Sequence, residues 1–177
     1  MQPIIYDVAI SIDGFISGPD GDISQFAQEG PVVEDYMARL ATYATAIMGR
    51  RTYEFGYRFG LKPGQNPYEH MTTLVFSRSL ELPENSDVEV HASGDAHLLG
   101  EFKASTPGPI YLCGGGAFAG ALLSLGLIDL LRLKRAPVIL GSGVHLFGDT
   151  AVSPALRHVE TRKYDGGYLF QEFALRG

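Results

Sequence analysis

The fold is decided by the stretch Pro109-Ile110-Tyr111-Leu112-Cys113-Gly114-Gly115-Gly116-Ala117-Phe118-Ala119-Gly120-Ala121-Leu122-Leu123. It begins as a short apolar strand bounded by proline, stops at three consecutive glycines and continues as a helix of small residues. Glycines at such a junction let a phosphate approach the backbone closely, where free N–H groups and the positive end of the helix dipole favour an anion. The stretch therefore predicts a strand–turn–helix unit that binds a nucleotide.

The same stretch satisfies the dinucleotide-binding pattern G-x-G-x-x-G/A through Gly114, Gly116 and Ala119. The acid expected about 20 residues later in a standard Rossmann domain is missing, because residues 131–147 contain no Asp or Glu. Three basic residues stand in that segment instead: Arg132, Lys134 and Arg135. They suit either a 2′-phosphate or an exposed strand face. The structural alternative for the motif is a glycine-rich turn that only packs tightly.

Composition predicts one globular domain over residues 1–177, because 45% of the residues are hydrophobic and 19% are charged. The net charge of −6 is scattered along the chain. The basic surface of a protein that binds nucleic acid or an anionic membrane is therefore not expected.

A single cysteine, Cys113, excludes an internal disulfide and any multi-cysteine metal site. The five histidines show no metal-ligand spacing, so no metal is expected. The N-terminus lacks the basic and apolar regions of a signal peptide, and no apolar run approaches the length of a membrane span. These features favour the cytoplasm.

The first strand and the first helix each supply a candidate acid. Residues 4–12 predict a buried strand that ends at Asp13, where the side chain either contacts a substrate or only shapes the following turn. Residues 31–43 predict a helix that begins with proline and carries Glu34 and Asp35 near its positive end. These acids either serve the site or compensate the helix dipole.

Two further strand ends suit anions. The strand 44–48 runs into Gly49-Arg50-Arg51-Thr52, where a glycine, two arginines and a threonine able to cap the next turn form a second phosphate site. The strand 72–76 ends at Ser77-Arg78-Ser79, a hydroxyl–basic–hydroxyl cluster that also suits a phosphate. More than one such junction in a small domain strengthens the prediction of a nucleotide site.

The last third of the chain predicts a core strand within 128–139, interrupted by Pro137, and then a hairpin. The hairpin consists of residues 156–164 and 168–175, which flank Asp165-Gly166-Gly167. Alternation of strands and helices followed by a hairpin predicts an α/β fold whose sheet is mostly parallel with an antiparallel edge. The apolar residues Leu169 and Phe173 would make that edge one that needs a cover.

The order of these pieces resembles the dihydrofolate reductase-like family, most closely the reductase domain of the bacterial bifunctional riboflavin deaminase-reductase. The segments that carry the resemblance span nearly the whole chain: residues 11–22, 47–54, 76–78, 111–116 and 140–147. Their common order and spacing are more specific than any one segment.

The resemblance implies an α/β fold of the dihydrofolate reductase type and NADPH as cofactor. It places the cofactor along three segments: Gly49, Arg50, Arg51 and Thr52; Ser77 and Arg78; and Gly114, Gly115, Gly116 and Ala117. It implies hydride transfer from the nicotinamide to a small-molecule substrate, and a homodimer. The missing deaminase half leaves the substrate open. This chain also has no Trp, which family members often carry after the Asp-Gly segment, and we expect Phe26 to take that place.

The leading hypothesis is an NADPH-dependent reductase of a small heterocyclic or carbonyl substrate, in which the protein orients the cofactor and supplies a proton. The candidate proton donors are Asp35 and Asp13, with Asp35 preferred and Asp13 as a loop-shaping or substrate-binding group. The alternative is a non-catalytic NADP(H)- or ligand-binding protein of the same fold, because a fold and a phosphate site do not establish chemistry.

Overall fold

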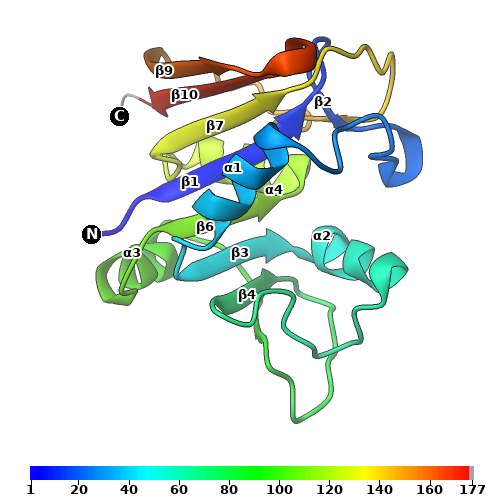
Figure 1. Cartoon of the computed structure of the whole chain (residues 1–177). Coiled ribbons are helices and arrows are strands. Elements are labelled where there is room, and N and C mark those ends of the chain that lie inside the picture. The colour runs from blue at the N-terminus through cyan, green and yellow to red at the C-terminus, as the bar shows by residue number, and fades with distance from the viewer. Residues whose placement is uncertain (176–177) are drawn as a thin grey trace.

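An eight-stranded sheet runs through the molecule in the order β5-β4-β3-β6-β1-β7-β10-β9 (Figure 1). The structure is a computed structural model and describes residues 1–175. The strands of this sheet are β1 Ile4–Ile10, β3 Thr45–Gly49, β4 Thr72–Phe76, β5 Glu89–His91, β6 Ile110–Gly114, β7 Leu130–Arg135, β9 Leu156–Lys163 and β10 Leu169–Leu175. Strands β5 to β7 in that order are parallel, and β10 is antiparallel to both β7 and β9. This confirms the predicted mostly parallel sheet with a C-terminal antiparallel hairpin.

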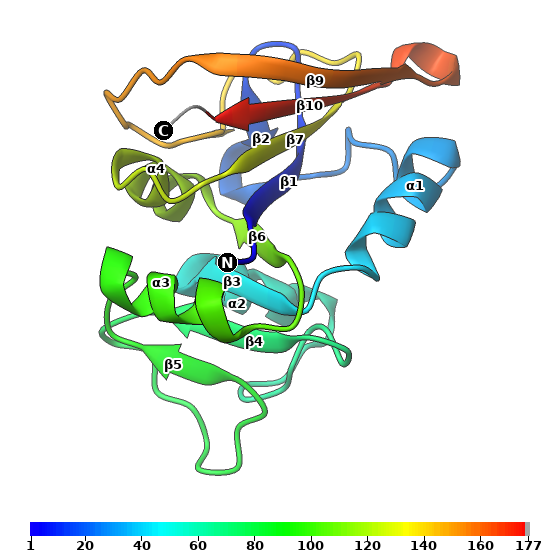
Figure 2. The same cartoon turned by 90° about the vertical axis from the view of Figure 1, so that its left-hand side faces the viewer.

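Helices cover both faces of the sheet, as Figure 2 shows, with α1 on one side and α3 and α4 on the other. Their bounds are α1 Pro31–Leu40, α2 Arg50–Phe55, α3 Ala96–Ser105 and α4 Gly116–Ser124, and 3-10 turns lie at Pro19–Gly21, Gly56–Phe59 and Asp165–Gly167. A separate two-stranded sheet pairs β2 Phe15–Ser17 with β8 Val144–His145. Among residues 1–175, no helix combines the length and the apolar character that crossing a bilayer requires.

Alternation along the central strands builds two apolar cores. In β1, Ile4 and Tyr6 pack with the side chains of α3 and α4, whereas Ile5 packs with residues of the α1 face. Strand β6 does the same with Leu112 and Tyr111. Successive residues of a strand point to opposite faces, so a strand buried on both sides must be apolar at nearly every position. This explains the continuous apolar runs of β1 and β6.

The C-terminal hairpin differs in one respect from the sequence prediction. Leu169 and Phe173 were expected on the sheet edge, but they belong to β10, which is flanked by β7 and β9. The edge strand is β9, which is exposed along almost its whole length and carries Arg157 and Lys163. Charged side chains on an edge strand oppose pairing with another chain. The edge itself is therefore a weaker argument for a dimer than the sequence suggested.

The strand predicted within 128–139 is shorter than expected. It ends at Arg135, because the chain leaves the sheet ahead of Pro137, which has no N–H to donate to a neighbouring strand. In the preceding turn Gly126 has a φ of +66°, and the amides of Gly126 and Leu127 bond to carbonyls of the last turn of α4. Helices commonly end in this way at a glycine.

Candidate active site

The carboxyl ends of the parallel strands bring the predicted cofactor segments to one edge of the sheet. Strand β3 lies between β4 and β6, so residues 49–52, 77–78 and 114–117 follow three neighbouring strands. The first and third segments touch. A Cβ built on Gly115 would lie 3.2 Å from Thr52 Oγ1, and one built on Gly49 would lie 3.3 Å from the Cβ of Phe118.

Two helices begin side by side at this edge, and within residues 1–175 no side chain caps the N-terminus of α2 or of α4. The first N–H groups of each helix are thus left for another acceptor, and the two helix dipoles add at the same place. Thr52 was expected to cap α2, but it is the third residue of that helix, with its hydroxyl beside Gly115. We call Gly114, Gly115, Thr52 and the first turns of α2 and α4 the phosphate cradle.

The three consecutive glycines, Gly114, Gly115 and Gly116, have different roles. A Cβ on Gly116 would collide with the carbonyl oxygen of His145, so tight packing against the loop after β8 requires this glycine. Gly114 has a φ of +126°, a conformation that favours glycine, and the nearest atom to its Cβ position is 4.0 Å away. Gly115 has ordinary extended backbone, and its missing side chain keeps the space beside Thr52 open. Packing therefore explains Gly116, whereas Gly114 and Gly115 leave room for a ligand.

The arginines near the cradle differ in whether other groups of the protein hold their guanidinium groups. Arg50 donates from Nε to Glu54 Oε1 at 2.9 Å and from Nη1 to Ser79 Oγ at 2.8 Å, so it is held between α2 and the loop after β4. Arg51 and Arg78 are exposed and form no hydrogen bond or ion pair within residues 1–175. These two guanidinium groups are free to meet a phosphate.

Ser77 stabilises the turn that carries Arg78. Its Oγ accepts hydrogen bonds from the backbone N–H of Ser79 at 3.2 Å and of Leu80 at 3.0 Å. The hydroxyl proton remains available to a ligand. At the other end of the cradle Ala117 is exposed in the first turn of α4. The glycine backbone, the two uncapped helices and the free arginines together fit the pyrophosphate and phosphates of NADPH.

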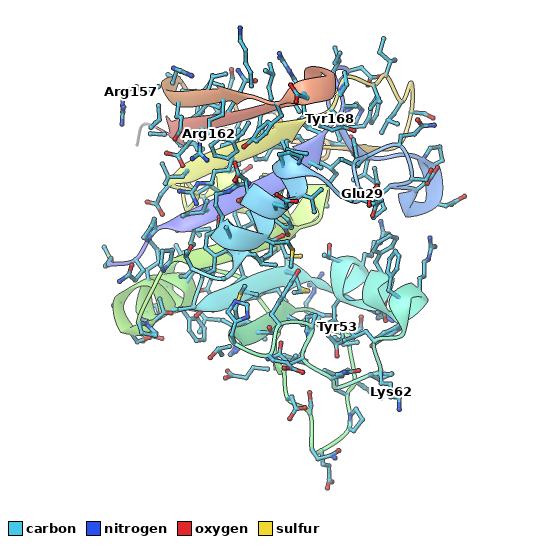
Figure 3. The ribbon with its side chains drawn as sticks, in the orientation of Figure 1. Glu29, Tyr53, Lys62, Arg157, Arg162 and Tyr168 are labelled. Atoms are coloured by element: carbon cyan, nitrogen blue, oxygen red, sulfur yellow. The ribbon has the colours of Figure 1, made fainter. Side chains whose placement is uncertain are left out.

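A cavity of about 300 Å³ lies next to the cradle, on the α1 face of the sheet. Its wall is largely apolar and aromatic, with Phe26, Tyr36, Tyr111 and Tyr168 among the lining residues. Figure 3 shows Tyr168 near the N-terminal end of α1. Cys113 also lines the cavity, and the next residue, Gly114, begins the cradle. The cavity and the cradle therefore adjoin at the end of β6, where Cys113 and Gly114 are consecutive residues.

A larger hollow of about 400 Å³ lies elsewhere, between residues 60–65 and 83–87. It is formed by loops, and Lys62, which belongs to it, lies far below the hairpin and α1 in Figure 3. It holds neither the cradle nor the aromatic wall. We therefore assign the candidate site to the smaller cavity.

The cavity wall contains a buried ion pair. Asp7 of β1 accepts hydrogen bonds from Arg39 Nε at 2.8 Å, from Arg39 Nη2 at 3.2 Å and from the Tyr43 hydroxyl at 2.9 Å. Arg132 of β7 donates to the Tyr43 oxygen at 3.0 Å and pairs with Glu172. Asp7 is the one acid among the lining residues that the structure describes, and its oxygens are already engaged.

Burial shifts the ionisation of the other polar groups in the wall. The tyrosine hydroxyls of Tyr36 and Tyr111 share a hydrogen bond of 2.7 Å, and burial raises the pKa of both well above the ordinary value. Burial also raises the pKa of the Cys113 thiol, which bonds with the Tyr68 hydroxyl at 3.3 Å. All three groups are thus protonated at neutral pH, and Cys113 is no activated nucleophile.

Neither predicted acid lines this cavity. The Asp35 carboxylate accepts hydrogen bonds from the Tyr164 hydroxyl at 2.6 Å and from Arg162 at 3.4 Å, and so faces the hairpin. Asp13 is exposed and accepts the backbone N–H groups of Leu140 at 3.0 Å and Gly141 at 2.7 Å. The hydrogen bond from the Ser11 hydroxyl has the largest effect, and with the two backbone bonds it lowers the Asp13 pKa to about 2. Asp13 therefore has the geometry of a loop-shaping group.

Sequence reasoning missed Lys134, Tyr36 and Asp7. Lys134 and Arg132 were expected either at a 2′-phosphate or on an exposed strand face, but their side chains are only 14% and 19% exposed and lie on the α1 face. The pairing of β1 with β7 could have indicated this face, because it places Asp7 opposite Arg132. Opposite charges on neighbouring strands indicate a common face. Phe26 was expected in the site and does line it.

Comparison with known proteins agrees with this architecture. The family described as RibD C-terminal domain matches residues 2–170. Two Bacillus subtilis proteins are similar over most of the chain: uncharacterized protein YwjB is 28% identical over 164 residues, 92% of each chain, and uncharacterized protein YyaP is 25% identical over 176 residues, 94% of this chain and 91% of its own.

Two solved structures show the fold. A Shewanella sp. PV-4 protein provisionally named for riboflavin biosynthesis superposes over 100% of both chains with a TM-score of 0.82 and 21% identity. Dihydrofolate reductase from Enterococcus faecalis, complexed with NADP(H), superposes over 99% of this chain and 97% of its own with a TM-score of 0.69 and 15% identity. The fold is dihydrofolate reductase-like.

Proposed function

The chain belongs to the RibD C-terminal domain family, and we propose that it is an NADPH-dependent reductase that transfers a hydride to a small heterocyclic or carbonyl substrate. The observation that carries this proposal is that the phosphate cradle begins at Gly114, directly after Cys113, which lines the aromatic cavity. The fold relative from Enterococcus faecalis was solved with NADP(H), which supports the same cofactor here.

The residues of the phosphate cradle and the nearby arginines would bind the cofactor and orient it. The N–H groups at the start of α2 and α4 take the pyrophosphate, and Arg51 and Arg78 offer cations for a phosphate on the adenosine ribose. Arg50 holds the loop after β4 against α2 through Ser79. NADPH, when bound, supplies the hydride. The protein contributes position, since a reactant held in place reacts far faster than one met by diffusion.

The cavity orients the acceptor. Phe26, Tyr36 and Tyr111 give the cavity an aromatic wall that suits a ring or a conjugated carbonyl and excludes water. Hydride transfer to a C=O or C=N group leaves negative charge that a proton must neutralise. Asp13 and Asp35 face away from the cavity, so we do not give them that role in the proposed reaction.

The alternative of a non-catalytic ligand-binding protein is supported by one observation. Asp7, the single acid in the cavity wall within residues 1–175, is fully engaged by Arg39 and Tyr43. Oxidation of NADPH with a panel of pterin, pyrimidine and dicarbonyl compounds distinguishes the two functions. Binding of NADPH without oxidation by any compound would favour the alternative.

Titration of NADPH into the wild-type protein and into Gly115→Val tests the cradle directly. The added side chain would stand within 3.2 Å of Thr52 Oγ1, in the space that we assign to the phosphates. We expect a loss of NADPH affinity of at least about tenfold, with the circular dichroism spectrum unchanged. Gly100→Val is the matched control, because nothing lies within 4 Å of that Cβ position on α3. Unchanged affinity in Gly115→Val would contradict the assignment, and a collapsed fold would show that the glycine serves packing.

A further inference from the structure

We propose that Lys134 is the anchor of the substrate cavity and that it selects a flat ligand carrying a carboxylate or carbonyl oxygen. This inference rests on the proposed function, because it names the class of substrate that the same cavity takes. It assigns a role to a lysine near the end of core strand β7, because lysine side chains are seldom buried without a partner.

The position of the ammonium group carries the argument. Lys134 lies on β7 with its side chain 14% exposed, and it lines the cavity. Its Nζ stands 3.0 Å from the centre of the Tyr36 ring, a cation–π contact that holds the side chain in place. Within residues 1–175 it has no hydrogen-bond acceptor, since the nearest carboxylate oxygen, on Asp7, is 3.9 Å away.

An ammonium group has three N–H donors, and within residues 1–175 Lys134 Nζ uses none of them in a hydrogen bond, with the Asp7 oxygen 3.9 Å away. A ligand oxygen that entered the cavity could accept a hydrogen bond from this ammonium group. The shared hydroxyl pair of Tyr36 and Tyr111 adds a further proton that can point to the same oxygen. The cavity therefore offers donors to a ligand.

The one carboxylate among the described lining residues is already engaged. Asp7 would attract an amidinium or a protonated ring nitrogen, but Arg39 and Tyr43 already occupy both of its oxygens. The positive charge of Arg39 largely neutralises the negative charge of the Asp7 carboxylate. A cationic ligand would meet Lys134 without a free counter-charge, and burial of like charges is costly. The cavity should thus reject cations and accept oxygen acceptors.

Ionisation of Lys134 sets the pH range of this selectivity. Burial lowers its pKa to about 8, against the attraction of Asp7 on β1 and with the repulsion of Arg39 on α1. Cys113 on β6 also faces it and stays a neutral thiol. The ammonium form therefore predominates at pH 7 and is lost as the pH rises through 8. Affinity for an anionic ligand should fall over the same interval.

Benzoate and benzamidine are suitable probes, because they have nearly the same size and shape and opposite charge. Their binding is measured by saturation-transfer NMR and calorimetry on the wild-type protein, Lys134→Met and Lys62→Met, without cofactor. Lys62 is an exposed lysine far from the cavity and serves as the control for loss of one positive charge (Figure 3). We expect benzoate to bind the wild-type protein more tightly than benzamidine. Lys134→Met should weaken benzoate about tenfold or more and leave benzamidine unchanged or tighter, whereas Lys62→Met should change neither.

Three results would overturn the proposal: tighter binding of benzamidine than of benzoate, benzoate affinity unaffected by Lys134→Met, or no benzoate binding. If Lys134→Met does not fold, the wild-type pH profile still decides, because benzoate affinity must fall between pH 7 and pH 9. A flat profile would refute the role of the ammonium group. NADPH affinity of the same variants is measured separately. Lost NADPH binding with retained benzoate selectivity would contradict the reductase proposal and leave this one standing.

Discussion

Replacing Arg39 with Met should destabilise the protein strongly, because it removes the cation that hydrogen-bonds the buried Asp7 carboxylate and leaves Asp7 with the Tyr43 hydroxyl and with Lys134 Nζ at 3.9 Å. The Asp7 side chain is 0% exposed and that of Arg39 is 12% exposed, with Nε and Oδ2 2.8 Å apart. Breaking such a pair costs about 3–5 kcal/mol in the free energy of unfolding. For a chain of this length, that corresponds to a fall in the melting temperature of roughly 6–20 °C. The loss is a large part of a typical total stability of about 5–15 kcal/mol.

Urea and thermal unfolding of three variants form the assay: Arg39→Met, Asp7→Asn and the double variant. The double variant should recover part of the stability, because it removes the stranded charge together with its partner. Arg50→Met is the matched control. It breaks the pair with Glu54, whose side chains are 43% and 33% exposed, and such helix pairs contribute about 0.3–0.5 kcal/mol. It also removes the exposed hydrogen bond to Ser79 Oγ, worth about 0.5–1.5 kcal/mol. If Arg39→Met cost no more than Arg50→Met, Asp7 would not be the neutralised wall residue described above.

Three further predictions concern the cofactor, the acids and assembly. NADPH should bind more tightly than NADH, and replacement of Arg51 and Arg78 by Ala should reduce this preference by about tenfold, as comparative titrations will show; equal affinities in the wild-type protein would refute it. Asp35→Asn and Asp13→Asn should retain parental turnover on the best compound of the substrate panel, since neither side chain lines the cavity; a dead Asp35→Asn enzyme would restore the original prediction from sequence. We also propose a homodimer, which sedimentation should detect at micromolar concentration; a monomer there would contradict it, and the exposed Leu156 and Val159 of β9 are the first positions to substitute if a dimer is found.

The sequence predicted the framework because its signals are local. Proline and three glycines bound the strand and helix of 109–123, and Asp165-Gly166-Gly167 closes the hairpin, as short-range steric rules require. The same rules placed the cradle at the strand ends. These local rules do not predict which residues of neighbouring strands and helices meet, such as Thr52 and Gly115.

The acid assignment could not be settled from sequence because it depends on one residue of helix register. Successive residues of an α-helix point about 100° apart. In α1 this turns Tyr36 and Val33 toward the cavity and Asp35 toward Tyr164 of the hairpin. Val33, Tyr36 and Leu40 recur at helical spacing, but this spacing alone does not show which neighbour Asp35 faces.

The Lys134 site could not be predicted from the sequence for a different reason. Its partners come from β1 and α1, about a hundred residues away in sequence, and a lysine in a strand ordinarily indicates an exposed face. Only the topology β6-β1-β7 puts Asp7 and Lys134 on one face under α1. Contacts of this kind depend on the packed fold and not on a local pattern.

A crystal structure of the protein with NADPH tests the central claim most directly. We expect the cofactor phosphates at the starts of α2 and α4, beside Gly115 and Thr52, and the nicotinamide ring at the mouth of the cavity next to Cys113. NADPH in the hollow between residues 60–65 and 83–87, or with its nicotinamide turned away from the cavity, would contradict the account.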